Sequence, residues 1–232
     1  MSARALLDDA ERYDHYRARC FESQANLAAR KGQIYEPSSV ADDVAAFMNE
    51  YAEATPLLQD ARIVVLHPSA DAGFPHTRPG NLVCMPAGAC RKTLECRETL
   101  LHEAIHLHQR AHLDAWIEHC RSQEWEPIAS DELPPSLLKN TRINPDTISL
   151  PFWAWKGVHV PLPLFSGDSM QAVDIRWFNR NTGELSGPPT SFTVKYGAPS
   201  QPEHPFEILA VNYAAAGYRS SADIFNAFRS RQ

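Results

Sequence analysis

Two histidines and a glutamate stand at a spacing suited to metal chemistry, in the segment His102-Glu103-Ala104-Ile105-His106. On a helix, positions i and i+4 lie on one face, one turn apart. Two imidazoles placed in this way can bind one zinc ion at about 2.0–2.1 Å. Glu103 then lies beside the metal, where it can take a proton from water that the metal activates. The spacing therefore predicts a catalytic metal site, with His102 and His106 as ligands and Glu103 as general base.

A third ligand must come from elsewhere, because a catalytic zinc ion usually has three protein ligands and one open position. An extended motif with a third histidine requires a glycine soon after the second histidine, and Leu107-His108-Gln109 does not supply it. Glu207 is the best candidate. It lies in the first turn of a predicted helix that Pro205 opens, and small residues follow at 210, 214 and 215. Small residues would let this helix pack close to the first, as a shared metal requires.

The two segments together resemble the gluzincin branch of the zincin superfamily of metallopeptidases. The resemblance rests on HEAIH at 102–106 and HPFEILA at 204–210, and it is closest to families whose third-ligand helix reads Pro-x-Glu-x-x-Ala. With the strand–loop–helix unit before the motif, it covers about a third of the chain. It implies a zinc ion held by His102, His106 and Glu207. The spacing of 101 residues between His106 and Glu207 exceeds that of compact gluzincins, which is compatible with an insert at 148–196.

Other polar residues are weaker candidates for this site. An oxyanion donor is needed for transition-state stabilisation, and the residues considered for it are Tyr213, Tyr196 and His159. Arg142, Asn144 and Asp146 form a polar cluster that could orient the site or bind substrate, and the sequence gives no mechanism for it. His108 lies about 160° around the helix from His106, so we do not expect it to bind the same metal. We expect His112 to be a surface or packed histidine too, and His204 is a weaker candidate ligand than Glu207.

Helices and strands that would position these residues follow from periodicity and breakers. We expect helices at 3–31, from about 40 to before Pro56, at about 91–119 with a possible break near 109–110, at 206–218 and at 222–231. Strands are expected at 62–67 and 81–85, the second as the edge strand before the motif helix. The loop at 68–80 contains Pro75-His76-Thr77-Arg78, which could line the cleft but which we expect to be a polar surface loop. Residues 121–151 are expected to be loop, and 148–196 β-rich with hairpin turns at 155–157 and 179–183.

These elements predict one α+β domain with a zincin-like core, in which a small sheet packs on the motif helix. The expected organisation is N-terminal helices at 1–56, strands plus the motif helix at 57–120, a β-rich insert at 148–196, and C-terminal helices with the third metal ligand at 203–231.

Composition is that of a globular protein and excludes several classes. The chain has 232 residues, of which 44% are hydrophobic and 22% charged, with a net charge of −6. An acidic chain without basic runs gives no case for a nucleic acid or anionic membrane partner. Five cysteines without C-x-x-C spacing predict buried or free thiols. The N-terminus lacks the pattern of a secretory signal, so we expect a cytoplasmic protein. The oligomeric state is not predicted.

Three functions remain open at this point. The first is a zinc metallopeptidase acting on a peptide or protein substrate. The second is a zinc- or other metal-dependent enzyme acting on a small-molecule amide or a biosynthetic intermediate, since two histidines and a carboxylate can hold iron as well. A closed pocket of a few hundred Å³ would favour this second function. The third is a non-catalytic module that binds a protein partner.

Overall fold

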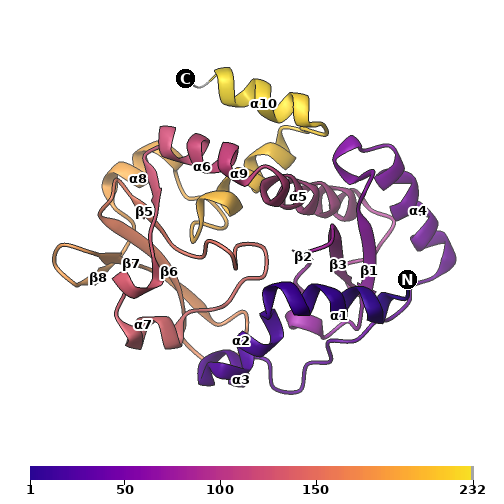
Figure 1. Ribbon diagram of the computed structural model, residues 1–232, viewed down its shortest axis with the longest axis horizontal. Coiled ribbons are helices and arrows are strands. Elements are labelled where there is room, and N and C mark those ends of the chain that lie inside the picture. The colour runs from indigo at the N-terminus through magenta and orange to yellow at the C-terminus, as the bar shows by residue number, and fades with distance from the viewer. Residues whose placement is uncertain (231–232) are drawn as a thin grey trace. The chain divides into compact units, whose positions relative to one another are not determined.

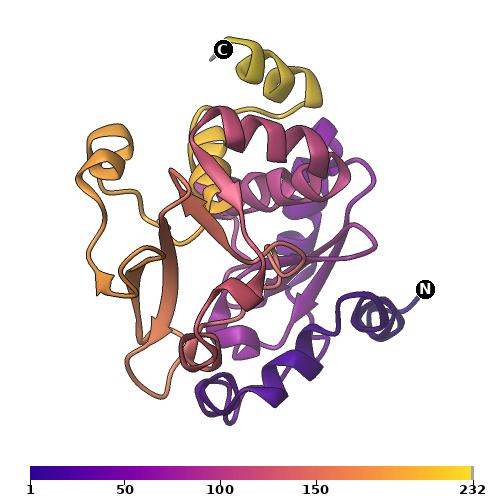
Figure 2. The same cartoon turned by 60° about the vertical axis from the view of Figure 1, so that its left-hand side comes forward.

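The computed structural model describes residues 1–230. The chain has a mixed α+β structure and divides into two compact units. The first unit consists of Met1–Arg17, Gly32–Ala111 and the segment from Asn212 onward, and the second of Ala18–Lys31 and His112–Val211. Figures 1 and 2 show the elements of each unit in two orientations.

The first unit contains a three-stranded mixed sheet. Its strands are β1 (Arg62–Leu66), β2 (His76–Arg78) and β3 (Leu82–Pro86), in the order β1-β3-β2. The central strand β3 runs parallel to β1 and antiparallel to β2. The segment at 81–85, expected to be an edge strand, is therefore central, and the expectation was wrong on this point. The antiparallel edge is instead β2, within the stretch for which we expected a loop.

Alternating side chains of this sheet bury opposite faces, as the two-residue period of a strand requires. Val83 and Met85 pack with residues of α4 (Asp42–Glu53) and α5 (Leu94–Ala111). On the other face, Leu82 and Cys84 pack with Leu7 and other residues of α1 (Ala3–Asp14). The result is a layer of helix on each side of the sheet, and Figure 1 shows α1 and α5 on opposite sides of it.

The motif helix α5 is confirmed as the longest helix of the described chain, with 18 residues. It ends at Ala111 because His112 leaves the helical conformation, with φ −126° and ψ 42°, and α6 (Leu113–Ser122) begins directly after it. The break expected near 109–110 is thus present two residues later. The helix α10 (Ser221–Ser230) ends the described part of this unit, and Arg231, expected to be its last residue, lies outside the described residues.

The single helix expected over 3–31 is broken into α1, α2 (Tyr16–Glu22) and α3 (Gln24–Ala29). His15 has a left-handed backbone with φ 52°, which ends α1, and the carboxylate of Asp14 accepts a hydrogen bond from the Tyr16 amide at 3.0 Å. Ser23 then caps α3 by accepting from the Asn26 amide. Helical periodicity continues through these breaks, so it does not reveal them.

The second unit contains a five-stranded antiparallel sheet. Its strands pair in chain order: β4 (Trp125–Pro127), β5 (Trp153–Trp155), β6 (His159–Phe165), β7 (Val173–Asn179) and β8 (Leu185–Ser186). The hairpin turns at 155–157 and 179–183 are confirmed, and Lys156 and Gly157 have the positive φ values that such turns require. The β region therefore begins before 148 and ends before 190.

Helices of this unit include α7 (Pro135–Asn140), α8 (Thr190–Tyr196) and the first part of α9 (Pro205–Ala215). One face of the sheet buries a hydrophobic cluster that includes Leu162, Leu164 and Phe178. The other face carries Trp125, Trp155 and Trp177 against Phe192 of α8. The expectations of loop at 121–151 and of strand up to 196 were wrong, because short segments here are fixed by packing on this sheet.

Two further features belong to the described chain. All five cysteines are buried thiols, as expected. No helix within residues 1–230 is long and apolar enough to cross a membrane.

Candidate metal centre

The two motif histidines face each other along α5. Their Nε2 atoms lie 3.0 Å apart, and the ring centroids are 4.7 Å apart. Two nitrogens bound to one tetrahedral zinc ion at about 2.05 Å would lie about 3.3 Å apart. The pair therefore needs only a small separation of the rings to hold one ion between them.

Gln109 fixes the protonation of the second histidine. Its Oε1 lies 2.7 Å from Nδ1 of His106, and both side chains are about 2% exposed. An amide oxygen can only accept a hydrogen bond, so Nδ1 of His106 is the donor. In a neutral ring the proton is then on Nδ1, and Nε2 presents its lone pair toward His102. This is how outer-shell partners orient metal-binding histidines.

Glu103 is the buried carboxylate of the motif. It is 3% exposed and lies one residue after His102, on a helix whose neighbours Ala104 and Ile105 are fully buried. A carboxylate in such surroundings is shielded from bulk water, which strengthens its electrostatic interactions with groups beside it. The position suits a group that receives a proton from a nearby water molecule.

Glu207 lies in the first turn of α9 and is 2% exposed. Within the second unit, Nδ2 of Asn144 donates to Oε1 of Glu207 at 2.7 Å. Oδ1 of Asn144 accepts from the Asp146 amide at 2.9 Å, which determines which end of the Asn144 amide faces Glu207. The polar cluster at 142–146 thus acquires a role that the sequence did not assign: Asn144 holds the carboxylate of Glu207 in one orientation.

Arg142 of the same cluster pairs with Glu203, a carboxylate in the turn that precedes α9. Its Nη2 lies 2.8 Å from Oε1 of Glu203. Burial raises the pKa of Glu203, the neighbouring carboxylate of Glu207 raises it further, and Arg142 opposes both effects. Arg142 therefore offsets part of the cost of burying two carboxylates four residues apart.

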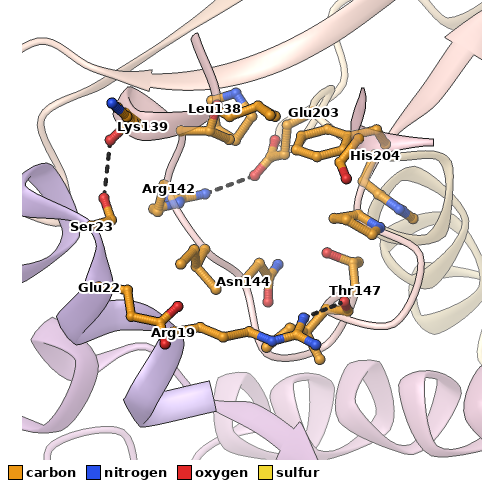
Figure 3. Close-up of a pocket in the computed structure, with 17 residues that line it drawn as sticks. Arg19, Glu22, Ser23, Leu138, Lys139, Arg142, Asn144, Thr147, Glu203 and His204 are labelled. Carbon is orange, nitrogen blue, oxygen red and sulfur yellow. Dashed lines mark hydrogen bonds and ion pairs between the residues drawn. The ribbon is translucent and has the colours of Figure 1, made fainter. Parts of the chain in front are cut away.

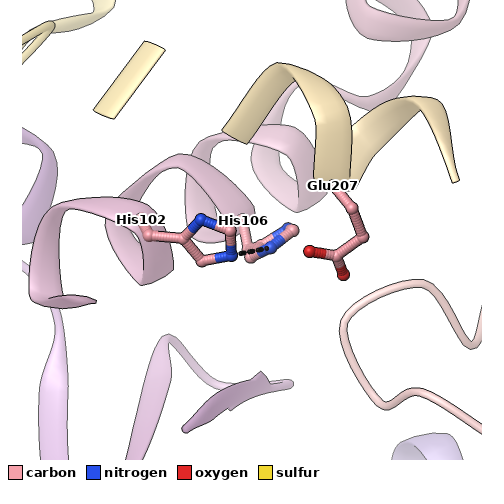
Figure 4. A group of neighbouring side chains, drawn as sticks. All are labelled: His102, His106 and Glu207. Atoms are coloured by element: carbon pink, nitrogen blue, oxygen red, sulfur yellow. Dashed lines mark hydrogen bonds between the residues drawn. The ribbon is translucent and has the colours of Figure 1, made fainter. Parts of the chain in front are cut away.

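Three side chains, those of His102 and His106 in the first unit and of Glu207 in the second, offer atoms that could hold a metal ion (Figure 4). The helix that carries Glu207 is continuous to Ala215, and Ala214 packs against the cluster that contains Leu101 and Ala104 of α5. Glu207 precedes Ala214 by seven residues, or two helical turns, so the two residues share a face of α9. Two imidazoles and one carboxylate are a donor set that suits zinc.

The candidate oxyanion donors have other contacts. The hydroxyl of Tyr196 accepts from Nε1 of Trp125 at 3.2 Å, and its ring packs on Trp155. Tyr213 is 1% exposed and its ring packs on Tyr218 and Phe228. It lies about 120° around α9 from Glu207. His159 is on β6, where burial lowers its pKa.

The remaining histidine candidates are held by other groups. His204 uses both ring nitrogens, because Nδ1 accepts from the Phe206 amide at 3.1 Å and Nε2 donates to the Leu150 carbonyl at 2.9 Å. His108 is buried, and its ring lies 5.2 Å from that of Phe225. The sequence analysis did not identify Gln109 as a partner of His106 or Asn144 as a partner of Glu207. The three-residue spacing between His106 and Gln109 on one helix is the one signal that could have indicated the first contact.

Comparisons of the chain with family models, with curated proteins and with solved structures found no match.

Proposed function

We propose that the chain is a zinc-dependent hydrolase with a zincin-like core, and that it cleaves amide bonds as a metallopeptidase does. The observation that carries the proposal is the pair His102 and His106, with Nε2 atoms 3.0 Å apart and Nδ1 of His106 donating to Gln109. A histidine pair with one ring oriented by a buried amide is what a metal-binding helix requires.

Three further observations support a zincin-like arrangement. Glu207 supplies a buried carboxylate whose orientation Asn144 holds. An antiparallel edge strand, β2, borders the sheet on which α5 packs. Side chains of β2 are linked to the helix as well, because Nη2 of Arg110 donates to Oγ1 of Thr77 at 3.3 Å.

Each residue has a defined part in the proposed reaction. His102, His106 and Glu207 would hold the metal. When bound, zinc would supply a Lewis acid that lowers the pKa of water. Glu103 accepts the proton as water adds to the amide carbonyl carbon, and passes it to the leaving nitrogen as the C–N bond breaks. Gln109 keeps His106 in the tautomer that can bind the metal. Tyr196 and Tyr213 stay predictions as oxyanion donors.

Replacing the proposed base tests this function. Glu103→Gln keeps the shape of the side chain and removes the proton acceptor, so turnover is expected to fall by about 10²–10⁴-fold at unchanged zinc content. The assay is digestion of a diverse peptide library by zinc-loaded protein, with products read by mass spectrometry. Glu98→Gln, an exposed position on the same helix, is the matched control. Full turnover by Glu103→Gln at normal zinc content contradicts the assigned mechanism.

A second candidate function is hydrolysis of a small-molecule amide. It is favoured by one observation: a cavity of about 480 Å³ in the second unit, with Asn144 in its wall. Pockets of this size suit small ligands, whereas an endopeptidase needs an open groove for an extended chain. In the library assay, absence of cuts by protein that holds zinc would favour this second function.

A further inference from the structure

The second unit contains a cavity of about 480 Å³ (Figure 3). All of its lining residues belong to that unit. In Figure 3 the Arg142–Glu203 pair and Arg19 lie on opposite sides of Asn144. The volume falls within the range of about 300–1,000 Å³ that is typical of small-molecule sites. The cavity is thus large enough for a compact organic ligand.

Asn144 connects this cavity to the metal-binding residues. Its side chain lines the cavity and also donates to Oε1 of Glu207 at 2.7 Å. Glu203, four residues before Glu207 and just ahead of α9, lines the cavity as well. A single side chain, that of Asn144, therefore links a ligand in the cavity to Glu207, a proposed zinc ligand.

Part of the lining is apolar and would bind a hydrophobic group. These residues come from α7, from the segment at 143–152 and from β6, and they are Leu138, Ile143, Ile148, Pro151, Phe152 and Pro163. Burial of apolar surface gives about 25 cal/mol per Å², so such a wall favours a ligand with a large aliphatic or aromatic group.

The charged part of the lining favours a ligand with a negative charge. It holds three cationic side chains, those of Arg19, Lys139 and Arg142, against the carboxylates of Glu22 and Glu203. Arg142 and Glu203 neutralise each other through their 2.8 Å ion pair. Arg19 is exposed, and its Nη1 donates to the Ile148 carbonyl at 3.3 Å. A guanidinium has five N–H donors, so Arg19 retains donors for a carboxylate.

We propose that this cavity binds the carboxylate-bearing, apolar end of a compact amide substrate, such as an N-acyl amino acid or the C-terminal residue of a peptide. The apolar wall takes the side chain, and Arg19 takes the carboxylate. The assignment of the ligand as substrate rests on the proposed hydrolase function. Hydrolysis of the amide then yields a carboxylic acid and a free amino acid, with water as the only co-reactant.

Binding measured without metal separates this inference from the proposed function. The protein is stripped of metal with a chelator and titrated by calorimetry with N-benzyloxycarbonyl-glycyl-leucine and with its C-terminal amide. The acid is expected to bind about 10- to 100-fold more tightly than the amide, the range for a charge-assisted hydrogen bond. Arg19→Gln should reduce binding of the acid to the level of the amide. Arg121→Gln, an exposed arginine of the same unit outside the cavity, is the matched control and should change nothing.

A second variant tests the cavity itself. Ile143→Trp adds bulk at a half-buried wall position and should abolish binding of both probes, with folding checked by circular dichroism. If Ile143→Trp does not fold, Arg19→Gln still tests the cavity, because Arg19 is exposed and its replacement should not disturb folding. A ten-residue peptide that ends in leucine distinguishes the sources: binding like that of the acid assigns the cavity to peptide ends, and weaker binding assigns it to small N-acyl amino acids.

The inference is overturned if neither probe binds, or if the acid binds equally well to wild type and to Arg19→Gln. Failure of the hydrolase proposal gives a different pattern. The acid would then bind to metal-free protein as described, while zinc-loaded protein would leave its amide bond intact.

Discussion

The protonation of His106 depends on a neighbour three residues further along α5. Gln109 accepts from Nδ1 at 2.7 Å and leaves Nε2 for a metal. Gln109→Ala removes this acceptor, so the ring can rotate and change tautomer. Zinc affinity is expected to fall by about 10–100-fold, as for other outer-shell partners. Competition with a chromophoric chelator measures it, with the exposed Gln59→Ala as control. Equal zinc affinity in wild type and Gln109→Ala would show that Gln109 does not orient the ligand.

A second prediction for a single residue concerns His159. Burial lowers the pKa of this histidine below its ordinary value of 6.5. As the pH falls through 6.5, the unfolded chain takes up this proton before the folded protein does. Stability that is present above pH 6.5 is therefore lost as the pH falls toward the folded-state pKa. The free energy of unfolding should decrease between about pH 7.5 and about pH 5.5.

In the variant His159→Phe, the free energy of unfolding should decrease less over this pH range, because phenylalanine binds no proton. Urea denaturation at several pH values measures it. His112→Gln, an exposed histidine, serves as control and should keep the wild-type slope. The same pH slope in wild type and His159→Phe would rule out the contribution of His159.

Some residues of the site could be predicted from the sequence and others could not, for a simple geometric reason. The relation of His102 to His106 depends only on their being on one helix, which periodicity predicts well. The hydrogen bond from Asn144 to Glu207 joins residues 63 positions apart, and no local pattern reveals such a contact. The polar cluster at 142–146 could therefore be noticed but given no function.

At the scale of elements, β2 shows how a polar segment becomes a buried strand. Arg78 is fully buried, and its Nε and Nη2 donate to the carboxylate of Asp14 at 2.6 Å each. It also donates to Glu11 at 2.8 Å and to the Tyr35 hydroxyl at 2.9 Å. The expectation of a surface loop was wrong because partners on α1, more than sixty residues away, satisfy this charge. Polar composition predicts exposure only where such partners are absent.

Removing the guanidinium of Arg78 should leave the Asp14 carboxylate buried without its cation. Arg78→Met keeps most of the side-chain volume, and is expected to lower the free energy of unfolding by roughly 3–5 kcal/mol. Denaturation by urea measures this change. Arg62→Met on β1, where the arginine is exposed, should change stability by less than about 0.5 kcal/mol. Equal stability of both variants would mean that the ion pair with Asp14 does not hold β2 against α1.

Whole-molecule architecture was predicted in outline. The mixed α+β structure, the long motif helix, the hairpins and the C-terminal helices follow from periodicity and turn residues. The pairing of β4 with β5 does not, since it joins Trp125 to Trp155 across a segment that reads as polar and proline-rich. The division into two units also depends on contacts between distant segments, such as Ala18–Lys31 with His112–Val211.

Zinc should stabilise the folded chain, because a ligand that binds only the native state adds free energy to it. At a zinc concentration of 100 times the dissociation constant, this amounts to about 2.7 kcal/mol. The midpoint of thermal unfolding is thus expected to rise with zinc in wild type, and not in His106→Ala. His112→Ala, an exposed histidine outside the motif, should keep the rise. An equal rise in His106→Ala would point to zinc binding elsewhere on the chain.

The central claim is that His102, His106 and Glu207 hold one metal ion. Its most direct test is the zinc content per chain. Elemental mass spectrometry (inductively coupled plasma) measures it after the protein is loaded with zinc and unbound zinc is removed. Wild type should hold close to one zinc ion, and His106→Ala and the isosteric Glu207→Gln should hold far less, with folding verified for each. No zinc in wild type, or as much zinc in both variants as in wild type, would contradict the account.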